Sequence, residues 1–311
     1  MSRSNRPSPQ RGEENEQEEP RYCAAGFEDC PIHRYARPDS FQGAAVSLHV
    51  FQPQRSVSAL SGMTRHVARA VLDFVYPPRC LLCDDDMISA ADATGSRLAF
   101  CADCHAKLCP AAGNECRCCG APLGPYTISD DGCPVCVREH FAFDEVIRLG
   151  LYRDELRTAC LMAKNPAGAL LGRALTDLLI EVKGTALATH TFDAIVPVPE
   201  HWLKRLVRPQ YAAETIACEL SRRLKVRLAT SILAKQRWTP KQARSSPGER
   251  RQQQRGAFRT SQRVSLRGQT VLLVDDILTT GATADEAARM LKRAGAKRVV
   301  VAVLAVSPPS A

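Results

Sequence analysis

The sequence predicts an α/β protein built on a parallel sheet and preceded by a small cysteine-rich module. Apolar, strand-like runs alternate with helix-period segments between residues 143 and 305, an order typical of a parallel sheet with helices on its faces. Ten of the 14 cysteines lie between Cys80 and Cys136. With 311 residues, the chain is long enough for two or three domains.

Composition excludes several classes of protein. The chain is 45% hydrophobic and 24% charged, close to a globular average, so it is not disordered throughout. No run approaches the roughly 18 apolar residues of a membrane span. The opening MSRSNRPSPQRGEENEQEEP lacks the apolar core of a signal peptide. We therefore expect a soluble, cytoplasmic protein.

The cysteines form two sets of paired Cys-x2-Cys turns, separated by 17 residues in the first set and by 13 in the second. Each turn aims two thiolates at one point, and two turns complete a tetrahedral zinc shell. Four thiolates leave no open position, which favours two structural Zn²⁺ sites. A disulfide framework or CxxC redox chemistry is the alternative. The expected ligands are Cys80, Cys83, Cys101, Cys104, Cys116, Cys119, Cys133 and Cys136.

Neighbouring residues refine the prediction for these sites. Gly120 follows Cys119, where a tight turn needs positive φ. Cys118 lies inside the same turn and could replace a neighbouring ligand. Cys160 and Cys218 fall in helical patterns, where we expect them to be buried as small apolar residues.

The chain divides into three expected parts. Residues 1–62 are rich in Pro, Ser, Gln, Arg and Glu, and we expect them to be disordered. Residues 63–142 should form an amphipathic helix and the double zinc module. Residues 143–311 should form the α/β domain, whose elements follow in chain order: strand 143–152, two helices within 154–182 broken at Asn165, Pro166 and Gly168, strand 193–199, helix 210–224, a basic segment 235–263, strand 270–275, helix 284–294 and strand 298–305.

The net charge of +9 is concentrated in one segment. Residues 201–267 hold 17 Lys and Arg against three Glu, whereas residues 1–62 are nearly neutral. A basic face implies an anionic partner, either a phosphate-rich small molecule or a nucleic acid. A long polar segment such as 235–263 inside a compact domain is more often functional than accidental.

The sharpest motif is a strand, two acids and a turn into a helix, VLLVDDILTTGAT at residues 271–283. Asp275 and Asp276 emerge at the carboxyl end of the strand, where open α/β sheets bind ligands. A Thr/Gly turn before a helix can point several backbone N–H groups at one anion. Adjacent acids beside such a turn suit ribose hydroxyls or hydrated Mg²⁺. The string is neither a Walker A loop nor GxGxxG.

This string resembles the phosphoribosyl-pyrophosphate (PRPP) motif of type I phosphoribosyltransferases. Together with the paired CxxC module, it makes the chain similar to the ComF family, which joins a zinc module to a phosphoribosyltransferase-like domain and is associated with DNA uptake. The resemblance covers about residues 70–306, including YRDELRTACLMAK at 152–164 and PVP at 197–199. It departs at Arg208, where the usual RGFNQ-like string reads RPQYA. The resemblance implies that Asp275 and Asp276 meet the ribose hydroxyls and that the 5′-phosphate is wrapped by Thr279, Thr280, Gly281, Ala282 and Thr283.

The resemblance leaves two classes of function open. One is a PRPP- and Mg²⁺-dependent transferase with an unknown acceptor, in which cationic side chains hold the departing pyrophosphate. The other is a non-catalytic protein that binds single-stranded DNA or competence proteins, with vestigial or regulatory PRPP binding. A zinc-stapled scaffold is a third option. No residue stands out as a general base, and His201 is expected at the surface. The candidate cations are Lys164, Arg208, Arg237, Lys241 and Arg250.

Overall fold

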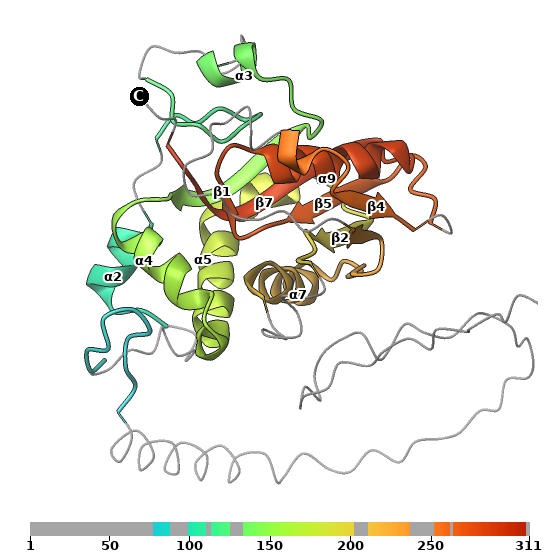
Figure 1. The fold of residues 1–311 in the computed structure, drawn as a ribbon. Helices are drawn as coiled ribbons and strands as arrows, with labels where there is room; N and C mark the ends of the chain where they lie inside the picture. The colour runs from blue at the N-terminus through green and yellow to red at the C-terminus, as the bar shows by residue number, and fades with distance from the viewer. Residues whose placement is uncertain are drawn as a thin grey trace, which may run out of the picture. The chain divides into compact units, whose positions relative to one another are not determined.

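The computed structural model describes residues 77–87, 99–109, 113–124, 133–201, 211–236, 252–261 and 264–308 (Figure 1). The predictions for residues 1–62 and for a helix from Met63 lie outside these ranges. Within them, no helix combines the length and the apolarity that crossing a membrane requires.

The described part is built on a parallel sheet, as predicted. Its main path runs in the order β1 (Glu145–Leu151), β7 (Arg298–Val306), β5 (Thr270–Val274) and β2 (Ala194–Pro197), with every pair parallel. The short strand β6 (Ile277–Leu278) also pairs with β7. Parallel pairing brings the carboxyl ends of all these strands to one edge, which is where the acids after β5 lie.

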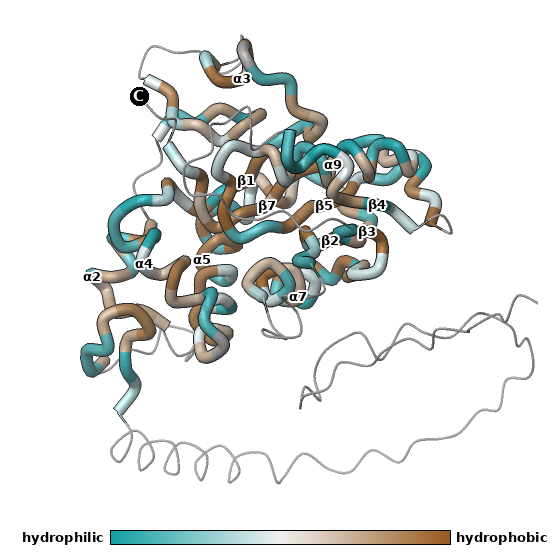
Figure 2. The backbone as a smooth tube through the Cα atoms, viewed as in Figure 1, coloured by the Kyte–Doolittle hydropathy of each residue, from teal (hydrophilic) through white to brown (hydrophobic). Residues whose placement is uncertain are grey.

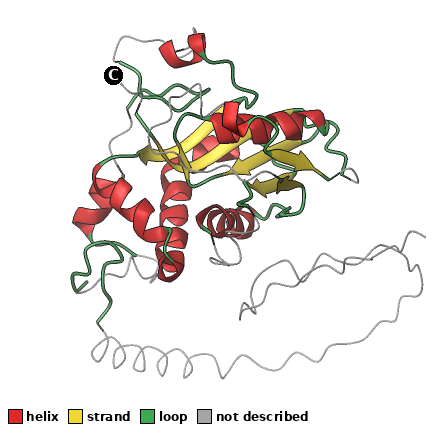
Figure 3. Cartoon of the chain, viewed as in Figure 1, coloured by secondary structure: helices red, strands yellow, loops and turns green. Residues whose placement is uncertain are grey.

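Helices cover both faces of the sheet, which explains why its strands are apolar almost without interruption. Alternate residues of a strand point to opposite faces. In β7, Val300 and Leu304 pack in a core with α4 (Asp154–Ala163), α5 (Ala169–Ala188) and α7 (Ala212–Leu224), whereas Val299 and Val303 pack in a second core with α9 (Ala282–Arg293). Figure 3 shows the strands between these two sets of helices, and Figure 2 shows the central strands in apolar brown.

The helix boundaries differ from the predicted ones in three places, and at one of them α7 begins at Ala212 rather than at residue 210. The break between the first two helices lies where it was predicted, at the short 3₁₀ turn η3 (Pro166–Gly168), but α5 continues to Ala188 rather than ending near residue 182. Helix α9 begins at Ala282, two residues earlier than predicted, because Gly281 adopts φ +75° and turns the chain directly into the helix. Ala282 and Thr283 therefore belong to the first turn of α9.

The sequence analysis missed four short elements besides β6. β3 (Leu233–Lys235) and β4 (Phe258–Thr260) form a separate antiparallel pair at the two ends of the basic segment, of which residues 237–251 lie outside the described ranges. Helices α2 (Ala102–Leu108) and α3 (Pro134–Arg138) begin directly after Cys101 and Cys133. Elements of three to seven residues are too short to show a hydrophobic period.

The second cysteine module (residues 113–138) is bonded to the edge strand β1. The Val146 N–H donates to the Arg117 carbonyl over 2.9 Å, and Arg148 Nε donates to the Gly120 carbonyl over 2.6 Å. Gly120 has φ +69°, as its place in a tight turn predicted, and a Cβ there would lie 3.0 Å from Val146. A glycine at this position lets the turn approach the sheet closely.

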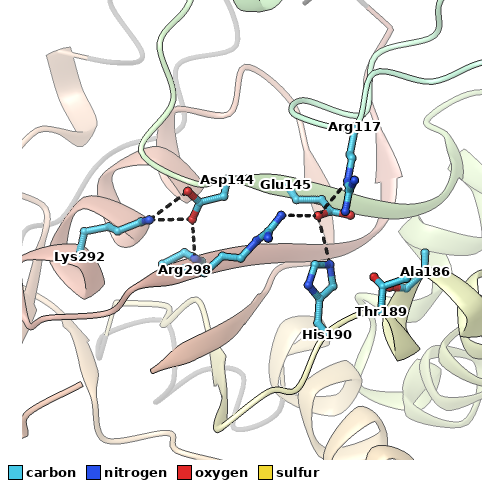
Figure 4. Close-up of polar contacts among 9 residues, drawn as sticks. Arg117, Asp144, Glu145, Ala186, Thr189, His190, Lys292 and Arg298 are labelled. Carbon is cyan, nitrogen blue, oxygen red and sulfur yellow. Dashed lines mark hydrogen bonds and ion pairs between the residues drawn. The ribbon is translucent and has the colours of Figure 1, made fainter. Parts of the chain in front are cut away.

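A buried carboxylate joins the same module to the sheet (Figure 4). Glu145 on β1 is 4% exposed, and its Oε2 lies 3.2 Å from Arg117 Nε, 3.0 Å from an Arg298 nitrogen and 3.1 Å from His190 Nε2. The first cysteine module (residues 77–109) shares a core with the sheet instead, through Leu108 and its neighbours. Both modules are thus parts of one packed body with the α/β domain.

Candidate functional site

Two groups of four cysteines converge, and they are the eight that the spacing predicted. Within each group, every sulfur lies within 4.8 Å of the others. Cys83 and Cys101 Sγ atoms are 3.7 Å apart, as are those of Cys116 and Cys136. Zn–S bonds of about 2.3 Å in a tetrahedron require sulfurs about 3.8 Å apart, so both groups fit a zinc ion. Together with the soft thiolate donors, this geometry supports structural Zn²⁺.

The shifted pKa values of the thiols also favour a bound metal ion. Burial and hydrogen bonds from neighbouring cysteines raise the pKa values of Cys104 and Cys136, because packed sulfurs cannot all carry charge without a cation. Burial also acts to raise the pKa of Cys80, but backbone N–H donors outweigh it and lower that pKa to about 6. A metal ion bound by all four sulfurs of a group would stabilise every one of them as a thiolate.

Cys118 lies outside the second group of four, so the structure does not support its replacing a neighbouring ligand. Burial raises its pKa, as it does for the thiol of Cys160, which is 1% exposed in the core as predicted. Cys218 is only partly buried.

The acid pair interrupts a strand without changing its register. β5 ends where Val274 pairs with Ala302, and β6 resumes where Ile277 pairs with Ala305, the same offset along β7. The Asp276 carbonyl accepts from Leu304 N–H over 3.1 Å, and Asp275 N–H donates to Ala302 over 3.1 Å. Both acids are therefore fixed at the carboxyl edge by the sheet itself.

A lysine from α4 meets this pair. Lys164 Nζ lies 3.1 Å from Asp276 Oδ2, and both side chains are mostly buried. Burial acts to lower the pKa of Lys164, but the charge and hydrogen bond of Asp276, together with the charge of Asp275, outweigh it, so that pKa is raised and the ammonium persists. Lys164 is thus a cation held at the edge where the acids emerge.

Asp275 is the most perturbed carboxylate of the site. Burial, helped by the charge of Asp276, raises its pKa from 3.8 to about 7, while Lys164 and Lys235 oppose the rise. Lys235 comes from the end of β3, and its Nζ lies 5.5 Å from the centre of the Phe258 ring. A titratable group so strongly shifted, in a cluster of opposite charges, is typical of a functional site.

The TTGAT loop (residues 279–283) follows the acids. Thr279 is exposed, and Thr280 Oγ1 accepts from Ala282 N–H over 3.4 Å. Gly281 caps α9 without a side-chain hydrogen bond. The first amides of a helix have no intrahelical acceptor, and they carry partial positive charge. This loop can therefore offer backbone donors to an anion beside the acid pair.

Most of the predicted site residues that the structure describes thus lie either in the two cysteine groups or at the carboxyl edge of the sheet. Arg208, Arg237, Lys241 and Arg250 lie outside the described residues. His201 is 6% exposed, so its prediction as a surface residue was wrong: it follows β2 at the crowded carboxyl edge. The sequence missed Lys235, which is hidden among 17 cations, and Phe141, whose ring lies against Gly281.

Comparison with known families defines the class of protein. Residues 71–137 match a double zinc ribbon domain, and residues 205–310 match a phosphoribosyl transferase domain. The chain therefore joins a double zinc ribbon to a phosphoribosyltransferase-like domain.

Relatives narrow the class further. Competence protein F of Haemophilus influenzae is 26% identical over 227 residues, covering 72% of this chain and 94% of that protein. DNA utilization protein YhgH of Escherichia coli is 29% identical over 190 residues, 60% of this chain and 81% of that protein. The resemblance to the ComF family is thereby confirmed. A purine phosphoribosyltransferase structure from Pyrococcus horikoshii aligns with 20% identity and a TM-score of 0.29, over 42% of this chain and 73% of that one.

Proposed function

We propose that this chain binds PRPP together with Mg²⁺ at the carboxyl edge of its sheet. The observation that carries the proposal is the acid pair Asp275–Asp276, with Lys164 3.1 Å from Asp276, directly before the TTGAT loop. A ligand that carries a sugar and two kinds of phosphate group requires three features side by side. These are hydrogen-bond acceptors, which the acid pair supplies, a cation, which Lys164 supplies, and backbone donors, which the TTGAT loop supplies.

Each feature suits one part of such a ligand. The carboxylates of Asp275 and Asp276 suit ribose hydroxyls and the water shell of Mg²⁺. The TTGAT loop and the start of α9 suit the 5′-phosphate, because helix N-termini favour anions. Lys164 and Lys235 offer positive charge for the pyrophosphate, which an enzyme of this class must stabilise as it departs.

We further propose that the protein acts in DNA uptake or utilisation in the cytoplasm. The names of its relatives, Competence protein F and DNA utilization protein, support the process. The compartment is supported by the two closed cysteine groups, since thiols stay reduced there. Transfer of phosphoribose to an acceptor remains part of the proposal, with the acceptor left open.

Calorimetric titration of the zinc-loaded chain with PRPP and Mg²⁺ tests the binding. We expect saturable binding by the unmutated protein and none by Asp275→Ala plus Asp276→Ala. Asp103→Ala, an exposed acid on α2, is the control and should bind normally. An unmutated, folded protein that gives no heat with PRPP would contradict the proposal. Release of pyrophosphate in the presence of nucleobases then separates transfer from binding.

The alternative ligand is single-stranded DNA. The ion pairs among the described residues argue against DNA as the main ligand. Arg222 and Arg223 belong to the basic segment, but they pair with Glu219 and Asp177. Their charge is thus partly neutralised within the α5–α7 surface. If labelled single-stranded DNA binds to the double-alanine variant as it does to the unmutated chain, and PRPP does not compete, the DNA-binding function is independent of this edge.

A further inference from the structure

An aromatic residue of the linker between the second cysteine module and β1 lies against the TTGAT loop. A Cβ built on Gly281 would lie 2.7 Å from Phe141 Cε1 and 3.3 Å from Cζ. The ring therefore occupies the space beside the loop at the residue where α9 begins. Only a residue without a side chain leaves room for both the turn and the ring.

The same ring reaches the second cysteine group. Phe141 packs against a small cluster that contains Cys116, Cys119 and Cys133, and also against the core under α9. Within the described ranges, no other residue is shared by these two clusters. Phe141 stacks on Phe143, with ring centres 4.7 Å apart and planes 14° apart. It thus forms a continuous packing path from the sulfurs to Gly281.

Hydrogen bonds hold the linker in this position. Ala142 N–H donates to Asp285 Oδ1 over 2.6 Å, and Asp285 lies in the first turn of α9, where its own N–H donates to the Gly281 carbonyl over 2.7 Å. Two residues on, Asp144 N–H donates to the Val299 carbonyl of β7 over 2.8 Å. The linker is therefore bonded to the helix that carries the loop and to the central strand.

We infer that Phe141 is a positioning residue that couples metal occupancy of the second cysteine group to the shape of the TTGAT loop. A cation between the four sulfurs would hold them in this close packing, and the ring rests on that packing. Loss of the metal would release the ring, and Gly281 would lose the surface against which its turn is fixed. This inference rests on the proposed function only for its consequence, which is weaker PRPP binding without the second zinc.

Hydrogen–deuterium exchange on the full, zinc-loaded chain tests the coupling without reference to any ligand. We expect Phe141→Ala to accelerate exchange in residues 279–285 while two zinc ions per chain are retained. Phe141→Leu, which keeps part of the ring's volume, should lie in between. Phe192→Leu changes a phenylalanine of the other core and should leave the loop unchanged. Unaltered exchange in Phe141→Ala would overturn the inference.

The consequence is measured by PRPP titration of the same variants. A coupling of ordinary size weakens PRPP binding by roughly tenfold in Phe141→Ala. By reciprocity, PRPP with Mg²⁺ should raise the zinc affinity of the unmutated chain, measured at equilibrium by competition with a chromogenic chelator, and should not raise that of Phe141→Ala. If the unmutated chain binds no PRPP, the proposed function fails, while the exchange result still decides the coupling. If PRPP binds with equal affinity to both proteins, the coupling does not reach the ligand, and the inference is wrong.

Discussion

Substituting Gly281 by alanine tests the packing of the TTGAT loop through stability. Gly281 has φ +75°, a conformation that costs an L-residue about 1–2 kcal/mol. The new Cβ would also lie 2.7 Å from Phe141 Cε1, so the ring must move. Overpacking of this kind costs about 1–3 kcal/mol. We therefore expect Gly281→Ala to lower the free energy of unfolding by about 2–5 kcal/mol.

Gly268 is a matched control for the backbone part of this cost. It has the same φ of +75°, but a Cβ there would meet nothing within 4 Å. Gly268→Ala should therefore lose only the conformational term. Urea unfolding of both zinc-loaded variants, followed by circular dichroism, gives the difference, which we assign to the Phe141 ring. When both glycine substitutions are made in a Phe141→Ala background and compared with Phe141→Ala alone, their losses should be equal. Equal losses at the two glycines would refute the close contact and the packing argument built on it.

Three further predictions concern charge and metal. Because burial raises the pKa of Asp275 from 3.8 to about 7, its native state retains a proton that the unfolded chain loses, so this group makes stability fall as pH rises between those values. Asp275→Asn should remove that slope in urea unfolding at a series of pH values, and an unchanged slope would contradict the shift. Metal analysis should find two zinc ions per chain in Cys118→Ser and one in Cys119→Ser; a loss in Cys118→Ser would make it a ligand. Glu145→Gln should lower the free energy of unfolding by about 2 kcal/mol, since two partly exposed arginines lose a buried partner. Glu155→Gln, from an exposed pair, should cost below about 1 kcal/mol, and similar losses in both variants would show that burial adds nothing.

The sequence alone was sufficient to predict those features that depend on residues close together in the chain. Paired cysteines three positions apart define a turn, so the metal groups could be identified from spacing alone. The strand before Asp275 is apolar throughout because both of its faces are covered, which makes its end easy to find. Lys164 was found by resemblance, and its 3.1 Å contact with Asp276 depends on the end of α4 reaching the edge of the sheet.

What could not be predicted depends on contacts distant in sequence. Nothing in the local sequence distinguishes Phe141 or shows that its ring meets a glycine 140 positions later. Lys235 could not be distinguished from other cations until β3 and β4 paired across the basic segment. His201 is buried where it follows β2, and its residue type alone does not indicate that burial.

The distribution of the basic residues favours one anionic ligand at that edge over a broad nucleic-acid surface. Two basic stretches, residues 202–210 and 237–251, lie outside the described ranges. The first comes directly after His201, which follows β2. The second begins shortly after Lys235, whose charge acts to lower the pKa of Asp275. Residues 202–210 and 237–251 hold eight of the segment's 17 Lys and Arg. The described residues that precede both stretches are therefore close to the edge that carries the acid pair. A compact ligand with one phosphate and one pyrophosphate group contacts few cations, whereas a DNA strand displaces a counterion for most of the phosphates it presents. The salt dependence of binding should accordingly be shallow for PRPP and steep for single-stranded DNA. A steep dependence for both ligands would mean that the basic stretches act as one extended surface.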